Sequence, residues 1–554
     1  MERKWWTLLA VCLGTFMLLV DVTIVNVALP SIQDDLHASF AQLQWVVDAY
    51  ALALAALLLT AGSLADMFGR RLLFSIGLAV FTVGSLLCGL ATGPVFLVAS
   101  RAGQGIGGAI MFATSLALLA QAFRGRERGT AFAVWGAVTG AAVAVGPVLG
   151  GVITTGWTWR GIFYVNIPIG VIAIAVTLWR VTESRDPNRR GVDVPGFGLF
   201  TAALIALVYG LIRAGEQGWG DDGVAICLVA AAVLLAAFVV AERRGSSPMF
   251  DLSLFRVPTF AGGSVAAFAV NGCVYALLLY IVLYLQDLLG YSALQTGLRL
   301  VIMSAVTLPA AIVSGRLSSR VPARLLIGLG LALSGAGLLL MAGLAADSTW
   351  THLIPGLVVA GVGSGLVNPA LANTAVGVVP HRSAGMASGI NTTFRQVGVA
   401  TGIAVFGTLF ATRLTDGIVT GLRGTPLAGH AHGLATAVSQ GEAGRVLGSL
   451  PPASRGTAEH VARAAFVSGL NEILLVAGIG ALVAAVAAFA LIRGRDFVAQ
   501  SAPSAPSAPS ESSEPSAPSA PSAPSAPSAP SRPETPAEPG TANAPGPQAY
   551  AEDR

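Results

Sequence analysis

The sequence predicts an all-α membrane protein, and three observations lead to this fold class. Hydrophobic residues make up 54% of the 554 residues and charged residues only 11%, well below the roughly one quarter that is usual in soluble domains. Apolar runs of about 20 residues, the length that crosses a bilayer, recur from Trp5 to Ile492. Arginine-containing connections separate many of these runs. We therefore expect one bundle of many membrane-spanning helices.

The apolar runs predict fourteen spans, at residues 5–29, 43–63, 73–92, 95–121, 131–154, 161–179, 195–213, 224–241, 259–286, 297–315, 323–345, 351–377, 389–412 and 466–492. No small-residue cleavage site follows the first run, so it is expected to remain as a helix. Arginines occupy every second connection, beginning with Arg70 and Arg71, and short cytoplasmic loops are the ones rich in Lys and Arg. We expect a protein of the cytoplasmic membrane with both termini in the cytoplasm.

Two short motifs recur in the second half of the chain. "GSLADMFGRR", from Gly62, has a diverged counterpart in "GRLSSRVPAR", from Gly315, and "RAGQGIG", from Arg101, aligns with "VAGVGSG", from Val359. Such an internal repeat indicates duplicated halves, which in transporters place a binding site between them near the midplane. The predicted division is a six-helix bundle at 1–190, two extra linker helices at 191–258 and a second six-helix bundle at 259–498.

Two further segments are expected outside the bundle. Residues 413–462 lack a spanning run and should form a long external loop before the last helix. Residues 499–554, with the repeat "SAPSAPSAPS", should be a disordered cytoplasmic tail of polyproline character, because Pro, Ala and Ser cannot bury a core. We expect no transport role for the tail; a spacer or tether is the alternative.

"GSLADMFGRR" connects spans two and three. Asp66 and Arg70 have the i,i+4 spacing of a helical ion pair, and Gly62 is expected to let two helices approach closely. The alternative is a basic loop that only sets topology. The second copy has Ser319 where Asp66 aligns, so its ion pair should be weaker. The candidate motif residues are Gly62, Asp66, Gly69, Arg70 and Arg71.

Four charged residues inside the spans are candidates for the transport pathway. Charges in a bilayer are costly and usually line a pathway or have a partner. Asp21, in "FMLLVDVTIVNVALP", is the best candidate for a proton site, because a desolvated carboxylate keeps its proton to higher pH. A static salt bridge to Arg101 is its alternative, and Arg101 could instead snorkel. Asp48, in the external third of span two, and Arg395, near the end of span thirteen, either line the pathway or snorkel.

Span five contains "VTGAAVAVGPVLGGVI", which is rich in small residues and has a proline. Small residues at four-residue spacing favour close helix crossing, and proline favours a kink. Packing alone would account for this pattern. The candidate motif residues are Gly140, Gly146, Pro147, Gly150 and Gly151.

Together, over residues 5–492, these motifs resemble the major facilitator superfamily and, within it, the fourteen-helix drug/proton antiporters. The resemblance implies the major-facilitator fold, with two six-helix halves and two extra central helices. It also implies that the motif at Asp66, Arg70 and Arg71 latches the outward-open state. It further implies that Arg101 contributes to proton coupling, and Asp21 to coupling and cation recognition. The ordered glycines and Pro147 in span five resemble the motif that marks exporters.

Several function classes are excluded or disfavoured by what the sequence lacks. Lys4 is the only lysine, so no P-loop GK[ST] exists and an ATP-driven pump of that type is excluded. The four cysteines have no ligand spacing, and no HExxH or nucleophile elbow occurs, so we expect no enzyme, metal or cofactor. The pI near 9 arises from loop arginines, so no nucleic-acid partner is expected.

The expected function is a proton-coupled antiporter that exports amphipathic or cationic drugs or antibiotics. Its partners would be the small-molecule substrate, protons and the lipid bilayer, and we expect a monomer. One alternative is a dedicated exporter of a single endogenous metabolite, as in antibiotic self-resistance. The other is a non-transporting receptor or scaffold that recruits a partner through its Pro-rich tail.

Overall fold

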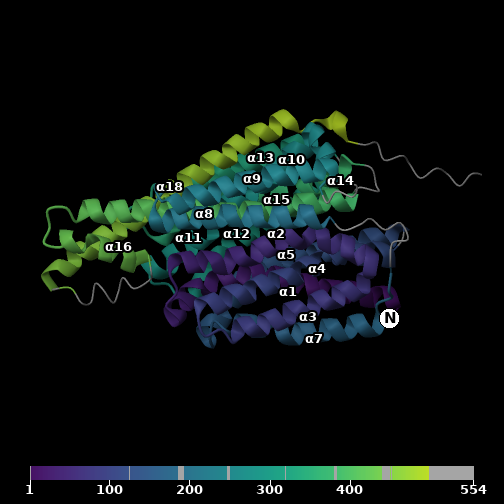
Figure 1. Ribbon diagram of the computed structural model, residues 1–554, viewed down its shortest axis with the longest axis horizontal. Coiled ribbons are helices and arrows are strands. Elements are labelled where there is room, and N and C mark those ends of the chain that lie inside the picture. Colours follow the sequence, from purple (N-terminus) through teal and green to yellow (C-terminus); the bar gives the residue numbers. More distant parts are fainter. Residues whose placement is uncertain are drawn as a thin grey trace, which may run out of the picture. The chain divides into compact units, whose positions relative to one another are not determined.

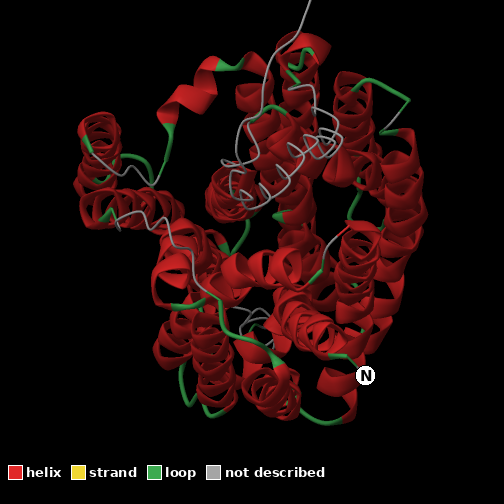
Figure 2. Cartoon of the chain, turned by 90° about the vertical axis from the view of Figure 1, so that its right-hand side faces the viewer, coloured by secondary structure: helices red, strands yellow, loops and turns green. Residues whose placement is uncertain are grey.

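The computed structural model describes residues 2–123, 125–184, 193–245, 250–318, 320–379, 384–439, 450 and 452–497. Ser319 and the tail after residue 497 lie outside these residues. Throughout the described part the regular structure is helical, with no strand (Figure 2). Fourteen of the described helices are long and apolar enough to cross a membrane, which confirms the predicted fold class. Met1–Val498 is one compact unit.

The first seven helices, which we call the N-terminal bundle, appear as purple to blue ribbons in Figure 1. Breaks between them follow from local chemistry: His37 ends the first helix with a φ of 49°, Ser39 starts the second with a capping box, and Gly69 separates the second and third with a φ of 125°. The helices are α1 (Arg3–Leu36), α2 (Phe40–Phe68), α3 (Arg70–Gly89), α4 (Pro94–Ala122), α5 (Gly125–Gly156), α6 (Gly161–Tyr164) and α7 (Asn166–Arg180).

The two extra helices, α8 (Val194–Gln217) and α9 (Asp222–Arg244), pack against each other as a hairpin. Asp221 caps α9 by accepting from Val224 N and also pairs with Arg213 at 2.7 Å. α8 packs on both α2 and α15, and Thr408 of α15 donates its hydroxyl to the Leu211 carbonyl at 2.6 Å. The extra hairpin therefore covers the junction between α2 and α15.

The remaining helices, which we call the C-terminal bundle, run from teal to yellow in Figure 1. Its first span, Pro258–Leu288, contains two π-helical segments, η2 and η3. The elements are η1 (Leu252–Arg256), α10 (Pro258–Ala269), η2 (Val270–Tyr275), α11 (Leu278–Leu283), η3 (Tyr284–Leu288), α12 (Ala293–Leu317), α13 (Ala323–Met341), η4 (Trp350–Leu353), α14 (Ile354–Gly377), α15 (Ala384–Gly421), η6 (Ala428–His430), α16 (Ala431–Ser439), α18 (Pro452–Leu491) and η7 (Gly494–Asp496).

The last two spanning helices are longer than predicted. α15 continues to Gly421 and α18 begins at Pro452, so much of the segment predicted as an external loop at 413–462 is helical, with α16 between them. Arg413 of α15 forms an ion pair with Glu472 of α18. Apolar runs mark only the part of a helix that needs lipid, so the polar extensions were missed.

The two bundles contact each other mainly through α5 with α12 and α2 with α15. Near the end of the molecule where α1 finishes, the Leu294 amide donates to Thr155 Oγ1 at 3.1 Å and Gln286 Nε2 donates to the Val27 carbonyl at 2.8 Å. Toward the other end, a methyl group added at Gly62 or Gly315 would meet nothing within 4 Å. The close approach predicted at Gly62 is therefore wrong for this arrangement, because the nearest elements lie too far away.

Candidate functional site

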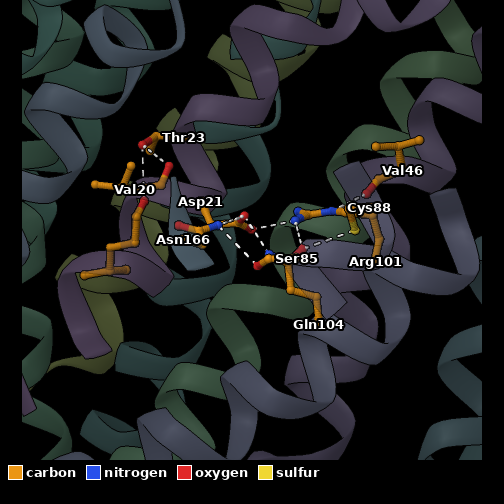
Figure 3. A network of polar contacts seen from close by, with 10 residues as sticks. Val20, Asp21, Thr23, Val46, Ser85, Cys88, Arg101, Gln104 and Asn166 are labelled. Atoms are coloured by element: carbon orange, nitrogen blue, oxygen red, sulfur yellow. Dashed lines mark hydrogen bonds and ion pairs between the residues drawn. The ribbon is translucent and has the colours of Figure 1, made fainter. Parts of the chain in front are cut away.

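Asp21 lies inside the N-terminal bundle on α1 and is 0% exposed (Figure 3). Its Oδ2 accepts from Arg101 Nη1 at 2.5 Å, and its Oδ1 accepts from Gln104 Nε2 at 2.8 Å and Asn166 Nδ2 at 3.1 Å. Ser85 Oγ accepts from the same two amides, at 2.8 and 3.3 Å. The carboxylate thus joins α1, α4 and α7, with α3 in the second layer of bonds.

Arg101 is the partner of Asp21 and is only 1% exposed. Besides the carboxylate, it donates to Gln104 Oε1 at 2.6 Å and to the Val46 carbonyl at 3.1 Å, and its guanidinium carbon lies 4.3 Å from the centre of the Tyr50 ring. A buried ion pair is tolerated when additional hydrogen bonds satisfy both groups, which is the case here. The structure therefore brings Asp21 and Arg101 together, and Arg101 does not snorkel.

Sequence reasoning missed Ser85, Gln104 and Asn166. Gln104 follows Arg101 by three residues and so lies on the same helix face, which was a usable signal. Asn166 and Ser85 are polar residues within apolar runs, but such residues often bond only to the backbone of their own helix. Asn166 reaches the carboxylate directly and Ser85 only through the amides of Gln104 and Asn166, and both arrangements depend on the packing of α3, α4 and α7.

Asp48 on α2 is the second fully buried carboxyl group, at 0% exposed. No described group hydrogen-bonds to either of its side-chain oxygens. One helical turn earlier, Gln44 Nε2 donates to Tyr280 Oη and to the Ile403 carbonyl, both at 3.2 Å, so this face of α2 packs against α11 and α15 of the other bundle. An unpartnered charge is far costlier to bury than a neutral carboxyl group, so the surroundings of Asp48 suit its protonated form.

Arg395 lies about three turns into α15, because the helix begins at Ala384. The helix extends beyond the predicted span at 389–412 on both sides, so the place of Arg395 near the end of that span stays a prediction. Its Nε donates to Asn391 Oδ1 at 3.2 Å, and its Nη1 donates to Asn368 Oδ1 on α14 at 2.8 Å. Asn368 in turn donates to Tyr275 Oη on η2 at 3.3 Å. The cluster contains no carboxylate among the described residues.

The motif between α2 and α3 forms its bonds within the N-terminal bundle. Asp66 Oδ1 accepts from Arg70 Nε at 3.0 Å and from Nη2 at 2.8 Å. Arg71 Nη2 donates to the Leu178 carbonyl at 2.5 Å. Glu183, which the sequence reasoning missed, accepts from the amides of Arg71 and Leu72 at 3.0 and 3.1 Å and so caps α3. The ion pair predicted for Asp66 and Arg70 is present.

The glycines of α5 lie where this helix meets two neighbours. A methyl group at Gly146 would collide with Thr23 of α1, and one at Gly150 would lie 2.8 Å from the Ile24 carbonyl. A methyl group at Gly151 would lie 2.6 Å from Leu294 Cα of α12 in the other bundle. Gly140 is less constrained, since its nearest neighbour is the Leu308 side chain at 3.1 Å. Pro147 lies inside the helix, and its carbonyl faces Gly297 of α12.

Metal chemistry finds no support in the described residues. They contain no group of three or more His, Cys, Asp and Glu side chains that could hold an ion, and Cys12, Cys88, Cys227 and Cys273 are all free thiols.

Two helical bundles with buried ionisable groups inside and a direct contact between them define a polytopic membrane transporter. The chain belongs to the Major Facilitator Superfamily, whose sequence profile matches residues 11–403.

Named relatives refine the comparison. The chain is 38% identical over 479 residues to the multidrug resistance protein Stp of Mycobacterium tuberculosis, covering 85% of this chain and 89% of the relative. It is 35% identical over 490 residues to the tetracenomycin C resistance and export protein of Streptomyces glaucescens, covering 88% and 91%. It is also 39% identical over 404 residues to the cephamycin export protein of Amycolatopsis lactamdurans, covering 72% and 83%.

A solved structure has the same fold. The bacterial homologue of the human lysosomal transporter Spinster, in an inward-facing and occupied conformation, matches with a TM-score of 0.60 and 17% identity, covering 90% of this chain and 99% of that one.

Proposed function

We propose that this protein is a proton-coupled antiporter that exports amphipathic small molecules across the cytoplasmic membrane without altering them chemically. The observation that carries the proposal is the contrast between two buried carboxyl groups: Asp21 is neutralised by Arg101, whereas Asp48 has no described partner. The negative charge of Asp21 is therefore held by its partner, whereas Asp48 can be charged or neutral. The names of the relatives, which include multidrug resistance and antibiotic export, support the choice of substrates.

In this mechanism Asp48 is the group that gains and loses the proton. It lies at the contact of α2 with α11 and α15, so a movement of one bundle against the other would expose it to water and let the proton leave. Proton and substrate can drive each other only if each binds the two arrangements with different affinity. The Asp21–Arg101 pair would hold α1 and α4 together while the bundles move.

We further propose a monomer with both termini in the cytoplasm, in an inward-facing arrangement that the contacts between the bundles support. Hydrogen bonds from Leu294 and Gln286 join the bundles near the end where α1 finishes, which would be the external side. At the other end, the hydrogen bonds that Asp66, Arg70 and Arg71 form with described residues stay within the N-terminal bundle. A latch that steadies the outward-open state would be disengaged here.

The test uses everted membrane vesicles with an imposed proton gradient and three compounds that share one fluorophore: dansylcadaverine, a cation; dansyl-glycinamide, neutral; and dansyl-glycine, an acid. The wild type should accumulate at least one of them and dissipate the gradient. Asp48→Asn should still bind that compound but do neither. Asp347→Asn, which removes an exposed loop carboxylate, should behave as the wild type.

Two results would contradict the proposal. If Asp48→Asn transports with unchanged proton coupling, Asp48 is not the proton site. If the wild type moves none of the compounds and leaves the gradient intact, proton-coupled export of amphipathic compounds is wrong for this panel, and the second candidate becomes preferable.

The second candidate is a dedicated exporter of one metabolite. Relatives named for tetracenomycin C and cephamycin favour it. A panel of chemically unrelated antibiotics distinguishes the two: cells expressing a dedicated exporter resist one compound class, whereas cells expressing a multidrug exporter resist several.

A further inference from the structure

Arg395 is a cation that forms no ion pair with any residue that the structure describes. Its three hydrogen bonds within the described residues go to Asn391 Oδ1, Asn368 Oδ1 and, at 3.5 Å, the Asn368 carbonyl, all of which are neutral. The Tyr275 phenol is linked to it through Asn368, which accepts from Arg395 and donates to Tyr275 Oη. A guanidinium has five N–H donors in a planar fork, so donors remain for a further acceptor.

Arg101, in the other bundle, is an arginine whose charge and hydrogen-bond donors have partners, and it serves as a comparison. It is 1% exposed, touches a carboxylate at 2.5 Å and lies over the Tyr50 ring. Arg395 instead remains partly exposed, as do Asn368 and Tyr275, although all three lie well inside spanning helices. Charged side chains within spans face the interior of the bundle or a water-filled space rather than lipid. By this rule the partly exposed side of the Arg395 cluster faces the interior of the protein rather than lipid.

The backbone around this cluster is tightly fixed. A methyl group at Gly272 would lie 2.9 Å from the Gly398 carbonyl, and one at Gly398 would collide with the Phe268 carbonyl, so η2 and α15 touch through their backbones. The π-helical turn of η2 ends at Tyr275, and π-helical segments often occur at functional sites. Tyr275, Asn368 and Arg395 are thus held in place by three different elements before any ligand binds.

We propose that Arg395, positioned by Asn368 and flanked by the hydroxyl of Tyr275, binds the carboxylate of an amphipathic organic acid, so that acids are preferred substrates of this transporter. The inference rests on the proposed export function and narrows its substrate class. A carboxylate matches the planar guanidinium fork, and the Tyr275 hydroxyl supplies a further donor. Both N–H groups of the Asn368 amide already donate, to Tyr275 Oη and to the Ser364 carbonyl, so Asn368 positions Arg395 and Tyr275 instead.

The other charges between the spans do not offset this preference. Asp21 is neutralised by Arg101, and the surroundings of Asp48 suit its neutral form. Among these four groups Arg395 alone has a net charge without a described counterion. An organic cation would be repelled at this position, so the cationic substrates implied by the family resemblance should bind less well than acids.

Binding to the purified full-length protein in detergent micelles, measured by dansyl fluorescence at pH 7 without a gradient, tests the proposal. Dansyl-glycine should bind at least about tenfold more tightly than dansyl-glycinamide, as expected for a hydrogen bond between charged groups. Arg395→Gln should bring this ratio close to one while leaving the affinity for the amide unchanged. Arg395→Lys, which keeps the charge but loses the fork, should reduce the ratio only in part.

Arg463→Gln is the matched control, because Arg463 pairs with Glu459 on the exposed surface of α18, and its acid-to-amide ratio should equal that of the wild type. The proposal is overturned if the wild type does not discriminate, if Arg395→Gln keeps the wild-type ratio, or if it weakens acid, amide and dansylcadaverine equally, which would indicate a structural role. If Arg395→Gln does not fold, an unchanged ratio in Arg395→Lys overturns it. The assay needs no proton coupling, so its result stands apart from the vesicle experiment.

Discussion

Replacing Asp21 with asparagine leaves Arg101 buried without a counterion. The carboxylate accepts three hydrogen bonds, of which the one from Arg101 is the shortest at 2.5 Å. An amide has one acceptor oxygen, so either Arg101 or the pair Gln104 and Asn166 loses its acceptor and faces an N–H₂ group instead. Breaking a fully buried ion pair by removing one partner costs about 3 to 5 kcal/mol. We therefore expect Asp21→Asn to lower the free energy of unfolding by about 3 to 5 kcal/mol.

Asp48→Asn provides the matched comparison, because it is the same substitution at a second fully buried carboxyl group. Here no described partner is lost, and one unpartnered neutral group replaces another. The expected change in the free energy of unfolding is within about 1 kcal/mol. The double variant Asp21→Asn/Arg101→Gln should recover part of the loss seen in Asp21→Asn alone, because it removes the stranded charge.

The assay is denaturant-induced unfolding of the three variants and the wild type in mixed micelles, followed by far-UV circular dichroism. Equal destabilisation by Asp21→Asn and Asp48→Asn would refute the reasoning, because it would mean that the two carboxyl groups are in equivalent electrostatic states. A double variant less stable than Asp21→Asn would refute the assignment of Arg101 as the stranded charge.

Three further predictions concern motifs outside the buried charges. Gly146→Ala should destabilise the protein by about 1 to 3 kcal/mol and impair export, because the added methyl group collides with Thr23. Gly136→Ala is the control and should change neither property, because its methyl group would meet nothing within 4 Å. Denaturant unfolding and vesicle transport measure the two effects. Asp66→Asn should cost at most about 0.5 kcal/mol in unfolding measurements because its ion pair is partly exposed, and a loss several times larger would contradict a surface pair. Deleting residues 501–554 should leave dansyl-compound export unchanged, whereas loss of function on deletion would favour the scaffold alternative.

The number and kind of helices follow from the sequence because lipid imposes its requirement residue by residue. Apolar length alone identifies fourteen spans, and the helix ends that it misses, such as Gly421 of α15, are those that leave the apolar environment. The start of α15 at Ala384, before the predicted span, was missed for the same reason, since these first residues do not look like a span.

The partners of buried groups could not be predicted in the same way. The cost of burying Asp21 and Arg101 was visible in the sequence. Their pairing, however, depends on how two helices pack whose paired residues are 80 positions apart. The sequence therefore offered this ion pair only as the alternative to a proton site at Asp21. Whether Asp48 has a hydrogen-bond partner depends on which residues of other helices surround it, and the sequence around Asp48 does not show this. Gly62 likewise has the residue type for close packing, yet in this arrangement nothing approaches it.

The contact between Pro147 and Gly297 joins the bundles through main-chain atoms, since the Pro147 carbonyl lies directly against Gly297. A side chain at a moving contact must change rotamer or be compressed each time the helices shift, and both cost energy. Because Gly297 on α12 has hydrogen in place of a side chain, no rotamer has to change at this position when α5 shifts against α12. The missing side chain of Gly297 also lets the two backbones approach directly, so main-chain contact sets the distance between the two helices while their crossing angle can change.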